Sequence, residues 1–185
     1  MNLNRIVAAV GLAFLVGCDY TVALVKTPEI PMDAALLGAW SRTDGNENDR
    51  SQRLLVLPLG PNEYLASFPA GEKDALFARV CLCRANERTL AQLTWFGTAQ
   101  GVIPNDARVF QYAAFSVKDN ALQVSLLNAD VVARDAASAE ALVKAIAASK
   151  DNPELFRAAM TFKKVKPPED PDAPVARPPT PPGWR

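Results

Sequence analysis

Cys81 and Cys83, separated only by Leu82, are the residues whose type and spacing could most readily do chemistry in this sequence. Two such thiols could bind a soft metal ion or act as a redox pair. In a β-strand, however, residues i and i+2 share a face, and their β-carbons are too far apart for the ~3.8 Å that a disulfide needs. A metal or redox role therefore requires the strand to bend. Without a bend, we expect two small apolar side chains packed on one face of a strand.

The sequence contains no histidine, the commonest general base and the commonest metal ligand. Ser-His-Asp and Cys-His sites, and zinc sites that use imidazole, are therefore excluded within this chain. The sequence also lacks a G-x-S-x-G nucleophile motif, and no spacing forces two acidic residues together. We therefore expect no catalysis, no cofactor and no metal site.

The segment TDGNEND at 43–49 places Asp44, Asn46 and Asn48 at the 1, 3, 5 spacing of a calcium-binding loop. The sixth position is Asp49 instead of glycine, and the twelfth is Leu55 instead of glutamate. These two departures exclude an EF-hand. We expect a hydrated hairpin loop, with a weak surface calcium site as the alternative.

Aromatic residues at strand spacing could line an apolar ligand cavity or simply fill a core. The candidates for lining such a cavity are Trp40, Trp95, Phe110 and Tyr112. Core packing is the more ordinary role of such residues, because a small barrel has little interior space.

The elements that must position these residues are short strands separated by turns. The expected strands cover 53–59, 63–69, 75–84, 89–96, 108–118, 121–127 and 160–165. Asp119-Asn120 is a two-residue hairpin signal, and Asp33 could cap a single helical turn. Ser138 is the expected N-cap of a helix reaching about residue 149, and Asn152-Pro153 predicts a second short helix over 153–159. The pattern predicts a mainly β fold (β-rich α+β), in which an antiparallel meander forms a small barrel or curled sheet with a helical insertion before the last strand.

Lysine plus arginine and aspartate plus glutamate both number 20, so no charge excess favours nucleic acid. With 49% hydrophobic and 22% charged residues, the composition is that of a folded domain. The last 19 residues contain eight prolines and predict an extended tail.

The N-terminus combines Arg5 with an apolar run of 11 residues from Ile6 to Val16, which is too short to span a bilayer. Leu15-Val16-Gly17-Cys18 follows and resembles the lipobox of bacterial lipoproteins. That resemblance implies cleavage between Gly17 and Cys18, and attachment of diacylglycerol and an amide-linked acyl chain such as palmitate to Cys18. Two or three acyl chains then anchor the protein to a membrane. An ordinary signal peptide is the alternative.

Asp19 follows the expected lipid site and resembles the signal that retains enterobacterial lipoproteins in the inner membrane. The resemblance implies a protein on the periplasmic face of the bacterial inner membrane, with the outer membrane as the alternative. We expect four regions: a signal peptide at 1–17, a lipidated tether at 18–34, a β-rich globular domain at 35–166 and a proline-rich tail at 167–185.

LLGAW at 36–40 is similar to the Gly-x-Trp opening of lipocalin-like barrels, in which the tryptophan plugs one end. Residues 18–165 as a whole resemble small lipoproteins of Gram-negative bacteria, a resemblance that implies no active site. Two functions follow as hypotheses. The first is a lipid-anchored periplasmic accessory protein that acts without catalysis, through an envelope protein partner or a small ligand. The second is a lipocalin-like carrier with a hydrophobic ligand in its barrel. An empty apolar interior would favour the carrier.

Overall fold

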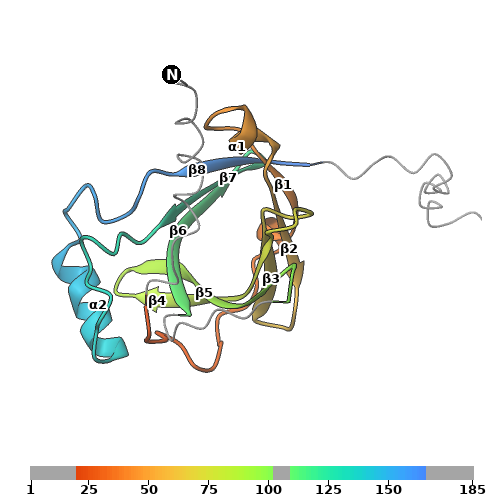
Figure 1. The fold of residues 1–185 in the computed structure, drawn as a ribbon. Coiled ribbons are helices and arrows are strands. Elements are labelled where there is room, and N and C mark those ends of the chain that lie inside the picture. The colour runs from red at the N-terminus through yellow and green to blue at the C-terminus, as the bar shows by residue number, and fades with distance from the viewer. Residues whose placement is uncertain (1–19, 102–108, 166–185) are drawn as a thin grey trace, which may run out of the picture.

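The computed structural model describes residues 20–101 and 109–165, and they form a closed barrel of eight antiparallel strands (Figure 1). Each strand pairs with the next along the chain, and β8 pairs with β1 to close the ring. The strands are β1 (Gly38–Arg42), β2 (Arg53–Pro58), β3 (Glu63–Phe68), β4 (Leu76–Ala85), β5 (Arg88–Thr98), β6 (Phe110–Lys118), β7 (Ala121–Leu126) and β8 (Met160–Lys164). The expected mainly β fold is confirmed. Of the two forms expected for it, a small barrel or a curled sheet, the structure has the barrel.

Turn chemistry accounts for the tight connections between neighbouring strands. Asp119 and Asn120 have φ values of 51° and 62°, as a two-residue hairpin of β6 and β7 requires, and Asn86 has φ 55° between β4 and β5. A one-residue slip would exchange the inner and outer faces of a strand, so these turns also fix which side chains enter the barrel. The hairpin expected at Asp119-Asn120 is confirmed.

Helices occupy the connections. The 3-10 turn η1 (Ala34–Leu36) is capped by the side chain of Asp33, and α2 (Ala139–Ala148) is capped by Ser138, whose hydroxyl accepts the N–H of Ala141 at 3.2 Å. Both caps were expected from the sequence. Helix α2 lies against the outside of the barrel, ahead of β8 (Figure 1).

Two local expectations were wrong. The expected second helix at 153–159 is a turn, in which the N–H of Leu155 donates to the carbonyl of Asn152 at 3.1 Å and Phe156 forms a β-bridge with Leu127. The expected hairpin loop at 43–49 contains the start of helix α1 (Glu47–Ser51). Asn46 and Asp49 form a capping box that begins this helix.

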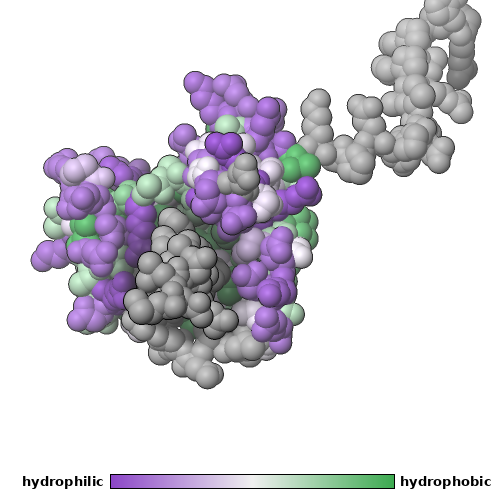
Figure 2. All heavy atoms as spheres, turned by 45° about the horizontal axis from the view of Figure 1, so that its top comes forward, coloured by the Kyte–Doolittle hydropathy of each residue, from purple (hydrophilic) through white to green (hydrophobic). Residues whose placement is uncertain are grey.

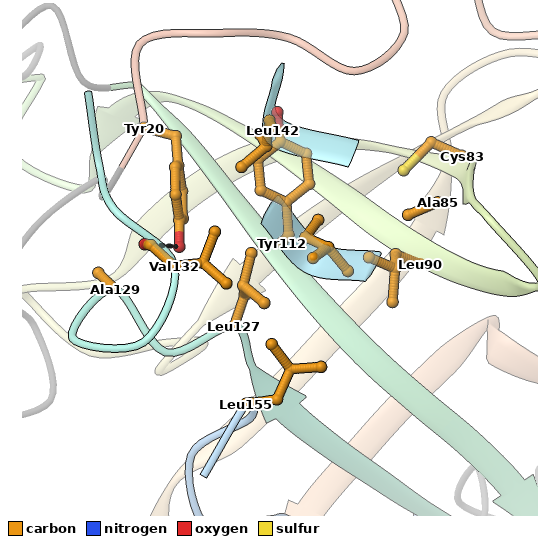
Figure 3. Packing of buried hydrophobic residues seen from close by; sticks show 11 residues of the cluster. Tyr20, Cys83, Ala85, Leu90, Tyr112, Leu127, Ala129, Val132, Leu142 and Leu155 are labelled. Atoms are coloured by element: carbon orange, nitrogen blue, oxygen red, sulfur yellow. Dashed lines mark hydrogen bonds between the residues drawn. The ribbon is translucent and has the colours of Figure 1, made fainter. Parts of the chain in front are cut away.

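Two apolar clusters stabilise the fold, one inside the barrel and one outside it. The inner cluster is centred on Trp40, Tyr64 and Phe162. The outer cluster, shown in Figure 3, lies between the barrel wall and α2, where Leu142 of α2 packs near Tyr112 of β6. Because both faces of β4 are covered, its burial pattern is nearly continuous, as expected for a strand between two apolar layers.

The segment before β1 differs from the tether expected at 18–34. Within its described part, Tyr20 is fully buried, and the backbone of Val25 is bound by the side chain of Gln92. Residues 20–33 therefore belong to the folded unit. We call residues 20–28 the strap, because they lie along the outer wall of the barrel.

Candidate ligand-binding cavity

The interior of the barrel contains an apolar cavity of about 300 Å³. Its wall is formed by Leu36, Leu54, Val56, Tyr64, Ala66, Phe68, Leu76, Val80, Leu82, Ala91, Leu93, Trp95, Gln111, Ala113, Phe115, Leu122, Val124, Leu126, Met160 and Phe162. Every strand except β1 contributes to this wall. Figure 2 shows that the described surface on this side of the molecule is largely hydrophilic, with hydrophobic side chains in the minority.

Strand alternation explains why the wall is apolar. On β4, Leu76, Val80 and Leu82 point inward, whereas Cys81 and Cys83 lie on the opposite face. None of the lining side chains carries a charge. Among the lining side chains, nitrogen and oxygen atoms are found only on Gln111, Tyr64 and Trp95. Such a space suits an uncharged apolar group, because burying a charge there without a partner would be costly.

The two ends of the barrel differ. At one end, which we call the mouth, Phe68 is aligned with Leu76, and both remain partly exposed. Trp95 and Met160 lie toward the same end and are also partly exposed. At the opposite end, which we call the closed end, η1 covers the interior with the buried side chain of Leu36.

Hydrogen bonds within the protein already use polar groups at the closed end, so few are left there to bind a ligand. The hydroxyl of Tyr64 accepts the N–H of Asp33 at 2.6 Å, and the indole N–H of Trp40 donates to the carbonyl of Leu36 at 3.0 Å. The ammonium group of Lys164 lies 5.1 Å from the centre of the Trp40 ring. At the mouth side, the indole N–H of Trp95 donates to Oε1 of Gln111 at 3.3 Å. The polar group of a bound ligand is therefore better placed toward the mouth.

The four aromatic residues considered from the sequence lie in three different places. Trp95 lines the cavity. Trp40 is fully buried in the inner cluster, but it does not border the cavity. Phe110 and Tyr112 belong to the outer cluster, so they are not part of the cavity wall. The hypothesis of a lining role is therefore corrected for Trp40, Phe110 and Tyr112.

Sequence reasoning named aromatic candidates and missed the aliphatic majority of the wall. The signal that could have found these residues is the period-2 alternation of each strand. It places Leu54 and Val56 of β2 on one face, and it does the same for Ala91 and Leu93 of β5. Gln111 was also missed, because a polar residue in an apolar strand is usually assigned to the outer face.

Cys81 and Cys83 are buried, free thiols on the outer wall beneath the strap. Burial, assisted by the nearby carboxylate of Glu63, raises the pKa of Cys81 to about 11. Burial, with Cys81 as a smaller contributor, raises the pKa of Cys83 to about 12. Thiols with raised pKa values are poor nucleophiles at neutral pH. Their placement matches the expected packing of two small apolar side chains on one face.

The acidic and amide residues at 44–49 make bonds within the protein. Asp44 pairs with Arg42, while Asn46 and Asp49 cap α1. Among residues 20–101 and 109–165, no group of three or more histidine, cysteine, aspartate or glutamate side chains is arranged to hold a metal ion.

The expected cleavage site at Gly17 and Cys18, and the expected sorting residue Asp19, lie outside the described residues, as does the tail at 167–185. In the part of the chain that the structure describes, none of the helices has both the length and the apolar character needed to cross a bilayer.

Comparison of the chain with protein-family models, with curated proteins and with solved structures found no match. The geometry of the cavity is therefore the basis for a functional conclusion.

Proposed function

We propose that this protein binds a small, uncharged apolar ligand inside its barrel while anchored to a bacterial membrane through lipid on Cys18. The single observation that carries the binding function is the apolar cavity of about 300 Å³. Pockets that bind small molecules begin at about this size and are lined mainly by hydrophobic and aromatic side chains. Of the two functions considered from the sequence, the cavity favours the lipocalin-like carrier over an accessory protein with a filled interior.

The cavity limits the size of the ligand. Since a water molecule occupies about 30 Å³ of liquid volume, the space corresponds to roughly ten non-hydrogen atoms. A medium-length alkyl chain or a compact ring compound fits this limit. The absence of charged side chains from the wall disfavours a ligand with a charge inside the barrel.

The membrane part of the proposal is supported by the order of residues in Leu15-Val16-Gly17-Cys18 and by the short apolar run before it. We propose the periplasmic face of the inner membrane, on the basis of Asp19, with the outer membrane as the alternative. This attachment adds no requirement to the binding site itself.

A series of straight-chain alcohols of increasing length, titrated calorimetrically into the purified protein, tests the binding function. Each methylene buried in the cavity should increase the affinity about fourfold, since it contributes about 0.8 kcal/mol. The increase should stop near a total of about ten non-hydrogen atoms, where the space is filled. Affinity that is undetectable at every length, or that rises with length without a break, would contradict binding in this cavity.

Cavity-filling variants provide the matched control. Ala113→Leu on β6 points into the cavity and should weaken binding, whereas Ser116→Leu lies on the exposed outer face of the same strand and should not. If Ala113→Leu does not fold, Ala66→Leu on β3 fills the same cavity from another wall.

A protein contact remains the second candidate function because of two exposed leucines. Leu57 and Leu59 are 40% and 45% exposed near the closed end and are only two residues apart in the sequence, and exposed apolar groups that form a contiguous patch can mark a protein interface. Copurification of one envelope protein with the native chain, lost with Leu57→Ser and Leu59→Ser, would support this function.

A further inference from the structure

The strap runs along the outside of the barrel from the mouth to the closed end. At the mouth, the backbones of Tyr20 and Phe110 exchange two hydrogen bonds of 3.0 Å each. Phe110 begins β6 and directly precedes Gln111 of the cavity wall. At the closed end, the side-chain amide of Asn62, in the turn between β2 and β3, donates to the carbonyl of Pro28 at 2.9 Å. The chain that precedes Tyr20 is therefore attached to the domain at the mouth.

Hydrogen bonds from side chains of the barrel wall keep the strap in this position along the barrel. Oε1 of Gln92 accepts the N–H of Val25 at 2.9 Å, and Nε2 of Gln92 donates to the carbonyl of Val25 at 2.8 Å. The hydroxyl of Tyr112 donates to the carbonyl of Val22 and accepts the N–H of Leu24. These side chains bind the backbone of the strap, as a strand-pairing partner would.

Tyr20 is held by its side chain as well as by its backbone. Its side chain is 0% exposed, its hydroxyl donates to the carbonyl of Val132 at 3.1 Å, and its ring centre lies 5.4 Å from that of Tyr112 (Figure 3). The start of the described chain cannot move toward the closed end unless these contacts break.

Cys18 is only two residues before Tyr20. An extended chain covers at most about 3.5 Å per residue, so a two-residue connection spans at most about 7 Å. A lipid on Cys18 would consequently hold the mouth close to the membrane surface.

An independent feature of the same end is the exposed side chain of Phe96. Phe96 is 47% exposed on the outer face of β5, and it directly follows Trp95 of the cavity wall. Its ring centre lies 6.5 Å from that of Phe77 on β4. Aromatic side chains of this kind are favourable at the interface between lipid and water.

We propose that the mouth of the barrel faces the membrane, so that the lipid bilayer is the surface with which the cavity exchanges its apolar ligand. This inference rests on the proposed anchor at Cys18. The ligand then enters with its apolar part first and leaves its polar group at the membrane side, where Gln111 and Trp95 lie.

Fluorescence quenching by membrane-bound nitroxide tests the orientation. The lipidated full chain is reconstituted in phosphatidylethanolamine and phosphatidylglycerol vesicles that contain a phospholipid with a nitroxide headgroup. A fluorophore is attached through Gln100→Cys, in the turn that follows β5 at the mouth, or through Lys118→Cys at the closed end; both positions are exposed. Because Cys81 and Cys83 are buried, labelling should be confined to the introduced thiol. We expect a large loss of fluorescence at Gln100 and little at Lys118.

An inserted linker provides the control. About twenty glycine and serine residues between Asp19 and Tyr20 have a mean reach of roughly 25 Å and should equalise the two positions while the protein stays attached. Equal quenching without the linker, or stronger quenching at Lys118, would overturn the orientation and leave the cavity and the anchor intact. A protein that does not remain with vesicles, and whose mass lacks a diacylglyceryl group, would overturn the anchor and the orientation together. The alcohol titration would still report on the cavity.

Discussion

The guanidinium group of Arg42 and the carboxylate of Asp44 form a two-point ion pair, with 3.2 Å between Nε and Oδ1 and 3.4 Å between Nη2 and Oδ2. Oδ1 of Asp44 also accepts the N–H of Thr161 at 2.9 Å. This one carboxylate therefore connects the loop between β1 and β2 to β8, at the position where the barrel closes. Arg42 is 6% exposed and also contacts Asp49 and Gln52.

The connection should be sensitive to acid. Desolvation works to raise the pKa of Asp44, but the hydrogen bonds from Arg42 and Thr161 outweigh it and lower the pKa below 3.8. A lowered pKa in the folded state contributes stability that is present above the unfolded value and is lost as the pH falls through the folded value. We predict that Asp44→Asn lowers the free energy of unfolding by about 1 kcal/mol at pH 7, because the pair is partly exposed. Denaturation in urea should show this difference shrinking below about pH 4. A difference that persists unchanged at pH 2 would contradict the role of the charge.

Gln92→Leu should loosen the strap. The substitution keeps the size of the side chain, but it leaves the N–H and the carbonyl of Val25 without the partners that Gln92 provides. Loss of such partners costs about 1–3 kcal/mol. Hydrogen exchange should accelerate at Leu24 and Val25, and the free energy of unfolding should fall. Gln123→Leu, on the exposed face of β7, is the matched control and should change neither. Unchanged exchange at Val25 would show that the strap is held without Gln92.

The fold was largely predictable because its signals are local. Asp119 and Asn120 favour positive φ, so their hairpin could be recognised from two residues. The choice between a closed barrel and a curled sheet was left open, because the pairing of Trp40 with Lys164 that closes the barrel joins residues at opposite ends of the domain. The strap was missed for the same reason: Val25 is bound by a side chain 67 residues away. Helix α1 was missed although its capping pair, Asn46 and Asp49, is visible in the sequence.

The cavity was less predictable than the fold. Residue type predicts that Phe110 and Tyr112 pack against an apolar layer. It does not show on which face of the sheet they do so, because the outer wall of the barrel is also apolar where the strap and α2 cover it. Whether a barrel is filled or hollow depends on the sum of many side-chain volumes. The small residues Ala66, Ala91 and Ala113 in the wall help to leave the space open.

Cys18→Ala should abolish membrane attachment and leave the domain folded. Cys18 precedes the described domain, and the apolar run before it is too short to span a bilayer. Lipid labelling should disappear, and the variant should be released from membranes by a carbonate wash. Its melting temperature should equal that of the parent chain released from the membrane by detergent. A variant that still floats with membranes would show that another segment provides the anchor.

The thiols of Cys81 and Cys83 should behave as packing groups. With a pKa of about 11, Cys81 should be thiolate in only about one molecule in a thousand at pH 8, and burial further restricts access. Alkylation of the native protein should therefore be slow and should become fast in denaturant.

Cys81→Ala and Cys83→Ala should each cost about 1 kcal/mol of stability, because each removes one buried sulfur and leaves a small void. Binding of the straight-chain alcohols should be unaffected, since neither residue borders the cavity. Rapid labelling without denaturant, or one equivalent of metal that is lost in the double variant, would instead establish the redox or metal role.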